Sequence, residues 1–450
     1  MLIDPSASVP LVPASSPAGT SPVAPGAEGG ALRQGVAAAG LLTIAVGLAN
    51  ALNVGFHLIV ARLIGVEEYS LLGTLLGVMM ILIVPTLALQ AVVARQVARD
   101  LQTVGPAAAG ATLRTWYRTL TRASLAGIVV LALVSVPIAA AVHTSRFVPI
   151  GTTLLAVAAG LALPVSWGGL QGIQRFRALA FSQILFSALK LGAGVVLALV
   201  GLHATAIMLG IAAAGLLTLG ASLLPLGELL SAAGRGVRTR SRLLLTRATV
   251  GSVASLTTLT ALTMSDLLVA RIAFSPHISG AYNAASISAR LLLVLPIAVT
   301  AVLLPRVAVL DDVRLERRLL VLGLAAVGAA SAAVVGVFYA LPHLLISLGF
   351  GTGYEAAESW LGPLGLAMAG YALVNVYAYQ LLAVGRSGVY ALVLAGTLLV
   401  QVAGFGFFHG RPEDLIAVQV VTAGLLLVVS EVAELLLVRR RDMTAPEAGV

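Results

Sequence analysis

The chain contains no cysteine, only one lysine, and few charged residues of any kind. Charged side chains make up 10% of its 450 residues, against about 25% in an ordinary soluble domain. The lack of cysteine excludes disulfides, thiolate metal sites and cysteine nucleophiles. The scarcity of charge excludes a soluble globular protein of ordinary composition. Almost all basic residues are arginine, which indicates a GC-rich coding sequence and a bacterial source.

Hydrophobic residues are correspondingly abundant. They make up 59% of the chain, and the mean hydropathy is +1.03. A membrane-spanning helix needs about 20 apolar residues, whereas transmembrane β-strands are shorter and alternate in polarity. The apolar stretches here are long and continuous, so the sequence predicts an all-α polytopic membrane protein with twelve transmembrane helices. The predicted helices are 36–61, 69–94, 119–142, 148–171, 178–200, 203–226, 248–273, 279–305, 319–345, 357–384, 387–408 and 413–438.

Arginine is distributed unevenly between the two ends of these helices. With a cytoplasmic N-terminus, 21 arginines fall in cytoplasmic segments and 4 in outside turns. Basic residues accumulate on the cytoplasmic side of membrane proteins, so both termini are predicted to be cytoplasmic and the protein to lie in the bacterial cytoplasmic (plasma) membrane. Residues 1–30 lack the basic and apolar regions of a signal peptide, and their composition favours a disordered tail.

A polar segment with five arginines, residues 227–247, follows six predicted helices and precedes six. Short motifs repeat across it: Val60-Ala61-Arg62 recurs 209 positions later as Val269-Ala270-Arg271, and Pro85 and Pro296 are 211 positions apart. Six helices return the chain to the same side, so the repeat predicts two lobes related by a parallel pseudo-two-fold axis. We expect Pro85 and Pro296 each to kink the second helix of its lobe. The predicted domains are a cytoplasmic tail (1–35), an N-lobe (36–226), a cytoplasmic linker (227–247), a C-lobe (248–438) and a C-terminal cytoplasmic tail (439–450).

This layout leaves little room for catalysis. The outside turns are too short to hold a sugar donor, and the sequence has no Ser/His/Asp set, paired loop carboxylates or metal-ligand spacing. We therefore expect no enzyme activity, cofactor or metal. A channel would need a selectivity filter or a charged ring, and neither is seen. The arginine clusters are explained by topology and anionic lipid, so no nucleic-acid partner is expected. The remaining class is an alternating-access carrier that acts as a monomer.

Several stretches resemble one transporter family. Residues 61–69, Ala-Arg-Leu-Ile-Gly-Val-Glu-Glu-Tyr, are similar to its turn between helices one and two. Three further stretches of this chain are similar to motifs of the same family. They are Gln171 to Phe176 with Lys190-Leu191-Gly192, Asp266 to Tyr282 with Leu303-Leu304-Pro305, and Gly349 to Tyr354 with Leu382 to Arg386. In order and spacing over residues 36–440, the motifs resemble the polysaccharide-transporter, or oligosaccharidyl-lipid flippase, branch of the multidrug/oligosaccharidyl-lipid/polysaccharide (MOP) exporter superfamily.

The resemblance implies a flippase that moves a lipid-linked oligosaccharide or cell-wall polysaccharide precursor outward across the cytoplasmic membrane. Its substrate would be a polyprenyl-(pyro)phosphate-linked saccharide, and its partners membrane lipids and glycosyltransferases or polymerases of the same pathway. One departure is Ser70, because glycine is commoner in the family at the position after Tyr69.

Ionisable groups in the membrane core cost about 2.5–3.5 kcal/mol each on insertion scales, so each needs a partner or a function. Counted at about 1.5 Å per residue from the nearest outside turn, Lys190, Asp266 and Arg290 lie near mid-membrane, and Asn53 joins the same layer. Two interpretations stay open. Either Asp266 and Arg290 form a structural ion pair while Lys190 bonds carbonyl groups, or the cations hold a phosphate or pyrophosphate between the lobes and Asp266 tunes or gates them.

Other polar residues lie on or near these helices. Tyr371, Asn375 and Tyr379 are spaced four apart on the helix at 357–384, so the stripe that they form either lines the cavity or serves helix packing. All six histidines fall at or near outer helix ends, where an interfacial polar role is expected. The candidate substrate-binding residues are Lys190, Arg290, Asp266, Asn53, Asn375 and Tyr371.

Two other functions stay open. A cation-coupled multidrug exporter of the same superfamily would be favoured by a carboxylate in the membrane core of the N-lobe, and predicted helices one to five carry none. A non-transporting membrane scaffold for cell-envelope synthesis would be marked by large polar tails, and only short ones are present.

Overall fold

The computed structural model describes residues 25–141, 148–232, 247–297, 299, 313–383 and 387–444. These residues are almost entirely helical, as the long apolar stretches predict. Ten helices in this part of the chain are long and apolar enough to cross a membrane. The chain is a multi-pass membrane protein.

The first six predicted segments form an N-terminal bundle. Its elements are α1 (Pro25–Thr103), α2 (Pro106–Ala141), α3 (Val148–Gly172), α4 (Phe176–Leu199), α5 (Ala204–Leu223), the 3-10 turn η1 (Leu224–Leu226) and α6 (Gly227–Ala232). Two predicted helices are joined in α1, which bends at Gly65 (φ 80°, ψ 169°). Glycine adopts a positive φ at little cost, so the bend falls there. α1 also begins at Pro25, ahead of the predicted start at residue 36.

The other six predicted segments form a C-terminal bundle. Its elements are α7 (Arg247–Ala273), α8 (Pro276–Ala289), the 3-10 turn η2 (Arg290–Val294), α10 (Val313–Ala340), α11 (Pro342–Phe350), α12 (Ala357–Ala383), α13 (Ser387–Phe407) and α14 (Pro412–Thr444). The prediction of an all-α membrane fold is confirmed. With the two arms of α1 counted separately, the described residues hold eleven membrane-length helices, and α2 contains the remaining predicted segment, 119–142, up to Ala141. The predicted end of helix 319–345 is wrong, because a short separate helix, α11, starts at Pro342 and ends before Gly351 (φ 86°).

The predicted proline kinks differ between the lobes. Ahead of Pro296, the α-helix stops at Ala289 and continues as 3-10 helix over Arg290–Val294. Proline lacks the N–H that would close an α-helical hydrogen bond and its ring crowds the preceding turn, so the helix loosens there. In α1 the backbone stays helical at Pro85, and the break lies at Gly65 instead.

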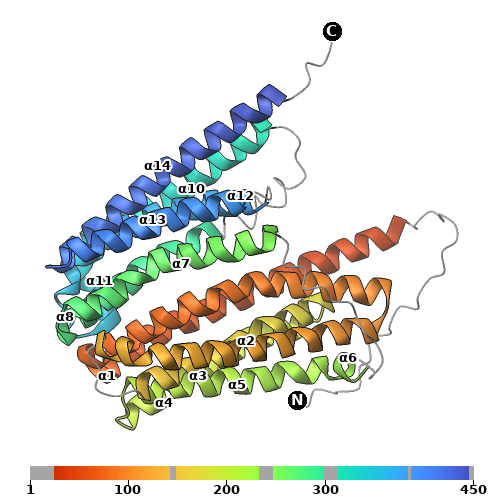
Figure 1. Cartoon of the computed structure of the whole chain (residues 1–450), viewed down its shortest axis with the longest axis horizontal. Coiled ribbons are helices and arrows are strands. Elements are labelled where there is room, and N and C mark those ends of the chain that lie inside the picture. The colour runs from red at the N-terminus through yellow and green to blue at the C-terminus, as the bar shows by residue number, and fades with distance from the viewer. Residues whose placement is uncertain are drawn as a thin grey trace.

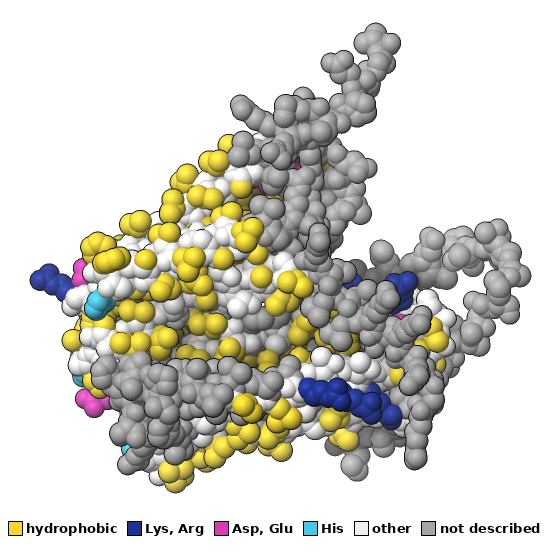
Figure 2. Space-filling model, viewed as in Figure 1, with side chains coloured by type: hydrophobic (Ala, Val, Ile, Leu, Met, Phe, Trp, Pro, Cys, Tyr) yellow, Lys and Arg dark blue, Asp and Glu magenta, His cyan; other side chains and the backbone are white. Residues whose placement is uncertain are grey.

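The two bundles meet at one end and diverge towards the other (Figure 1). In the N-lobe, α1 packs against α3 and α4; in the C-lobe, α7 packs against α13, and α12 against α10 and α14. α1 also crosses to the C-lobe, where it contacts α7, α8 and α11. Figure 2 shows hydrophobic side chains spread along the visible flank of the helices, as expected for a surface facing lipid.

The lobes touch where the second arm of α1 meets α7 and α8. Ser70 and Ser279, both fully buried, hydrogen-bond through their hydroxyl groups. They are 209 positions apart, the spacing of the sequence repeat, so equivalent positions of the two halves meet at the pseudo-two-fold axis. Arg271 Nη1 donates to Ser70 Oγ at 3.0 Å, and Asn283 Nδ2 donates to the Ser70 carbonyl oxygen at 3.0 Å. Ser70 therefore helps to join the lobes.

Gly280 allows this close approach, and its replacement is expected to destabilise the protein. A Cβ at Gly280 would lie 2.0 Å from the carbonyl oxygen of Val66. Because overpacking typically costs about 1–3 kcal/mol, Gly280→Ala should lower the melting temperature of the purified protein. Gly336→Ala is the matched control, since a Cβ at this helical glycine meets nothing within 4 Å. Equal melting temperatures for the two variants would contradict this account.

Candidate functional site

A cavity of about 390 Å³ lies between the lobes. Both arms of α1 and α4 form its N-lobe wall, and α7, α8, η2, α11 and α12 form its C-lobe wall. Four of the six predicted site residues line this cavity, namely Asn53, Lys190, Arg290 and Asn375. Three of these residues, Asn53, Lys190 and Arg290, were grouped by their predicted depth in the membrane, and the fold brings them from both lobes to the same cavity.

Lys190 is the cation of the N-lobe wall. Its side chain is buried, its Nζ donates to Asn53 Oδ1 at 2.6 Å, and the same atom lies 4.3 Å from the centroid of the Phe56 ring. Both contacts stabilise an ammonium group. Within the described residues no carboxylate pairs with Lys190, so its charge is not neutralised there.

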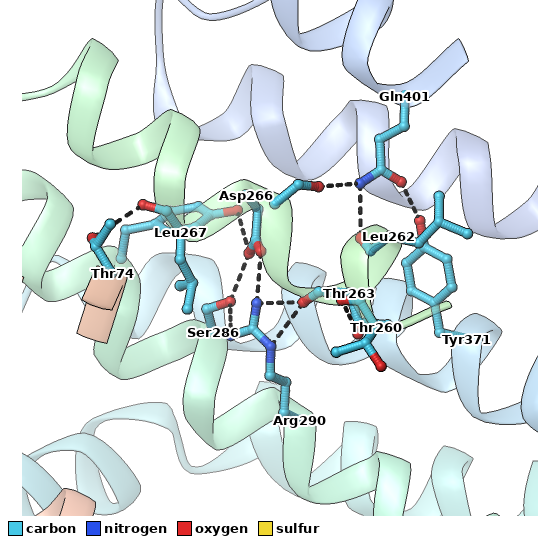
Figure 3. A network of polar contacts seen from close by, with 12 residues as sticks. Thr74, Thr260, Leu262, Thr263, Asp266, Leu267, Ser286, Arg290, Tyr371 and Gln401 are labelled. Carbon is cyan, nitrogen blue, oxygen red and sulfur yellow. Dashed lines mark hydrogen bonds and ion pairs between the residues drawn. The ribbon is translucent and has the colours of Figure 1, made fainter. Parts of the chain in front are cut away.

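Asp266 and Arg290 form an ion pair in the C-lobe wall. Figure 3 shows the guanidinium directed at the carboxylate, with Nη2 2.6 Å from Oδ1, and Asp266 is fully buried. Asp266 Oδ2 accepts hydrogen bonds from the hydroxyls of Ser286 (2.8 Å) and Tyr282 (3.3 Å). Arg290 also donates from Nε to the Thr263 carbonyl oxygen at 2.9 Å and from Nη1 to Ser286 Oγ at 2.6 Å.

This geometry matches the structural ion pair that the sequence left open. Arg290 lines the cavity, whereas Asp266 is not among the lining residues. Asp266 balances the charge of Arg290, and its buried carboxylate needs that partner. Lys190 and Arg290 therefore differ: Lys190 offers an unbalanced charge to the cavity, and Arg290 does not.

The predicted polar stripe on α12 divides between two environments. Asn375 and Tyr379 line the cavity, but Tyr371 is fully buried inside the C-lobe, where its hydroxyl bonds Gln401 and Thr422. Each step of four residues turns a helix by about 40°, so residues eight apart face different directions. The prediction that Tyr371 is a substrate-binding residue of the cavity is therefore corrected: Tyr371 lies inside the C-lobe.

His57 lies in the cavity wall, although an interfacial position was expected from the sequence. Its Nδ1 is 3.2 Å from the Tyr69 hydroxyl oxygen. A sequence signal for this position existed: Asn50, Asn53 and His57 are spaced by three and four residues and share one helical face. All three line the cavity.

Aromatic side chains close the cavity at the end where the lobes meet. Phe350, the last residue of α11, lines the cavity, and its ring centroid is 6.0 Å from that of Tyr69 and 5.4 Å from that of Tyr354. All three rings are buried. The Tyr354 hydroxyl donates to the Ala61 carbonyl oxygen at 2.9 Å. These rings pack together between the lobes. The sequence does not predict this contact, because the predicted helix 319–345 includes the start of α11.

Arg62 ties α11 to the N-lobe. Its Nη2 donates to the carbonyl oxygens of Ser347, at 3.0 Å, and Leu348. Carbonyl groups in the last turn of a helix lack helical partners, and the helix dipole there favours a cation.

In the turn that follows α11, the backbone N–H of Gly353 donates to the Glu355 carboxylate, and this hydrogen bond lowers the pKa of Glu355 below its usual value.

No protein-family model matches the sequence, and no curated protein matches it. Solved structures match the fold. The lipid II flippase MurJ in an inward closed conformation is 10% identical, with a TM-score of 0.67 over 91% of this chain and 94% of that chain. An inward-facing multidrug resistance MATE family transporter of the MOP superfamily is 12% identical, with a TM-score of 0.62 over 88% and 96% of the two chains. The chain has the two-lobed fold of MOP-superfamily transporters.

These structures also distinguish two conformations. An outward-facing MATE family transporter of the MOP superfamily is 12% identical over 90% of this chain and 96% of that chain, with a TM-score of 0.50. The TM-score of the inward-facing transporter is 0.62. The similarity to both structures shows that this chain has the same fold.

Proposed function

We propose that this protein is an alternating-access flippase that moves a polyprenyl-linked saccharide outward across the cytoplasmic membrane. The observation that carries the proposal is the cavity between the lobes, in which Lys190 is a buried cation without a described acidic partner. A phosphate group supplies the missing negative charge through charge-assisted hydrogen bonds. Amide and hydroxyl groups of Asn50, Asn375 and Tyr379, on opposing walls, suit the hydroxyl groups of a sugar.

The proposed direction of transport rests on the membrane orientation that the arginine distribution predicts. With both termini cytoplasmic, Gly65 and α11 lie at the outer face, and the lobes diverge towards the cytoplasm. In this state the headgroup enters from inside. Release outside requires Arg62 to part from the carbonyl groups of α11 and the lobes to separate at Ser70 and Ser279. Glycosyltransferases or polymerases of the same pathway would supply and use the lipid.

A cation-coupled multidrug exporter is the competing function. It would be expected to present a carboxylate to a coupling cation or a cationic drug. Within the described residues the cavity lining contains no aspartate or glutamate, and the nearby Asp266 is paired with Arg290. These observations favour an anionic substrate. A scaffold that does not transport has no use for a charged cavity between two lobes.

Reconstitution of the purified full-length chain into liposomes tests the proposal. The probe is a fluorescent polyprenyl-phosphate-linked sugar, and dithionite quenches the label that reaches the outer leaflet. We expect flipping that depends on the protein, and no uptake of ethidium under a proton or sodium gradient. Ethidium transport without flipping would replace the proposal with drug export. Movement of neither probe would favour a scaffold.

A disulfide between positions 70 and 279 is expected to stop flipping. The chain has no cysteine, so Ser70→Cys with Ser279→Cys introduces the only thiols, and the two hydroxyls already hydrogen-bond, which brings their Cβ atoms within reach of disulfide geometry. Oxidation should hold the lobes closed and reduce flipping to background, and a reductant should restore it. Ser70→Cys alone is the matched control. Full flipping by the oxidised pair would contradict alternating access.

A further inference from the structure

The ionisable groups around the cavity sum to one net positive charge. Lys190 contributes one positive charge that no described carboxylate balances. Arg290 contributes a second, which Asp266 balances at 2.6 Å. His57 is counted as neutral, because its Nδ1 faces the Tyr69 hydroxyl at 3.2 Å and no described carboxylate pairs with it. No other lysine, arginine, histidine, aspartate or glutamate is found in the described cavity lining.

Arg290 is poorly placed to hold a ligand's charge. Its contacts with Thr263, Ser286 and Asp266 engage four of its five N–H donors. Asp266 is fully buried, so a ligand that drew Arg290 away would leave an uncompensated carboxylate in the protein interior. The pair is therefore expected to stay closed when a ligand binds.

We infer, on the basis of the proposed function, that the transported headgroup carries a single negative charge, as in a polyprenyl phosphodiester of a sugar. A phosphodiester has one ionised oxygen, whereas a pyrophosphate linkage has two. The first charge is balanced by Lys190. A second would remain unbalanced in the membrane core, where isolated charges are costly. A cavity of about 390 Å³ is near the lower end of the usual range for small-molecule sites, which suits a small headgroup.

Binding of two matched lipids to the purified full chain tests this inference. The probes are polyprenyl-phosphate-glucose and polyprenyl-pyrophosphate-glucose with the same prenyl chain, compared by competition in nanodiscs of zwitterionic lipid. We expect the phosphodiester to bind at least about tenfold more tightly. Equal or tighter binding of the pyrophosphate would overturn the inference and leave the flippase proposal standing. Binding of neither lipid would overturn both.

Variants of the ion pair change the charge count without touching Lys190. Asp266→Asn raises the net charge to two and should abolish or reverse the preference for the phosphodiester. Asp266→Asn with Arg290→Gln returns the net charge to one and should restore it. An unchanged preference in Asp266→Asn would show that charge does not set selectivity. If that variant does not fold, the wild type and the double variant decide: a preference for the pyrophosphate in either overturns the inference.

A soluble anion is distinguished from a lipid headgroup by dimethyl phosphate, which carries the same charge without a prenyl chain. It should compete only weakly with polyprenyl-phosphate-glucose. Competition as strong as that of the lipid would mean that the cavity takes a soluble phosphodiester, and would overturn the lipid-linked substrate.

Discussion

Lys190→Ala is expected to slow the flipping of a lipid-linked sugar by roughly 100-fold or more. A charge-assisted hydrogen bond contributes about 1.5–3 kcal/mol, and the phosphate would also lose the charge that balances it in the membrane core. The melting temperature should stay near that of the wild type, because Lys190 has no described ion pair to lose. Flipping rates per reconstituted molecule and melting curves measure the two effects.

Two variants serve as controls for this result. Lys190→Arg keeps a cation and should retain part of the activity. Ser187→Ala changes a buried residue on the same helix, outside the cavity lining, and should flip at the wild-type rate. Normal flipping by Lys190→Ala, or a loss that only follows a fall in melting temperature, would contradict a role for Lys190 in headgroup binding.

Arg290→Ala is expected to destabilise the fold by about 3–5 kcal/mol, because it leaves a buried carboxylate without its partner. Asp266 is fully buried, and the hydroxyls of Tyr282 and Ser286 alone would remain to stabilise its charge. Asp266→Asn with Arg290→Gln removes both charges together and should recover most of the stability. Unfolding of the purified protein in detergent, monitored by circular dichroism, measures the difference.

The opposite result would assign Arg290 a different role. If Arg290→Ala keeps the wild-type stability while flipping is lost, Arg290 contacts the headgroup directly and the ion pair is not structural. The double variant separates the two roles in either case. Near wild-type stability with flipping retained means that the pair is structural, whereas near wild-type stability without flipping points to a direct role for one of the two charges.

Much of the fold and part of the site could be predicted, because hydropathy determines where helices cross the membrane and the helical rise determines depth. Lys190, Asn53, Asp266 and Arg290 were placed in one layer by counting residues from the turns. The structure brings Asn53 and Lys190 into contact, and Asp266 and Arg290 into contact. Depth alone could not say which residues within the layer would pair.

Features that depend on rotation about a helix axis or on short segments were missed. Tyr371 faces the C-lobe interior. The sequence does not reveal this, because α12 has buried apolar residues on several sides and no pattern marks the side that faces the cavity. The short helix α11 was joined to its neighbour, although Leu341-Pro342 and Gly351 mark its ends. The bond from Arg62 to α11 joins residues 285 positions apart, a distance over which local pattern carries no information.

The contact between Ser70 and Ser279 limits what can occupy the axis. Near a pseudo-two-fold axis, equivalent positions of the two halves face each other, so one residue type at both positions must be complementary to itself. A hydroxyl meets this condition, since it can donate to and accept from an identical group, whereas two copies of one charged residue would repel each other. Away from the axis the constraint lapses. Arg62 and Arg271 are equivalent in the repeat, yet one binds the end of α11 and the other binds Ser70. The two equivalent arginines therefore make different contacts in the two halves, whereas the two equivalent serines share a single contact.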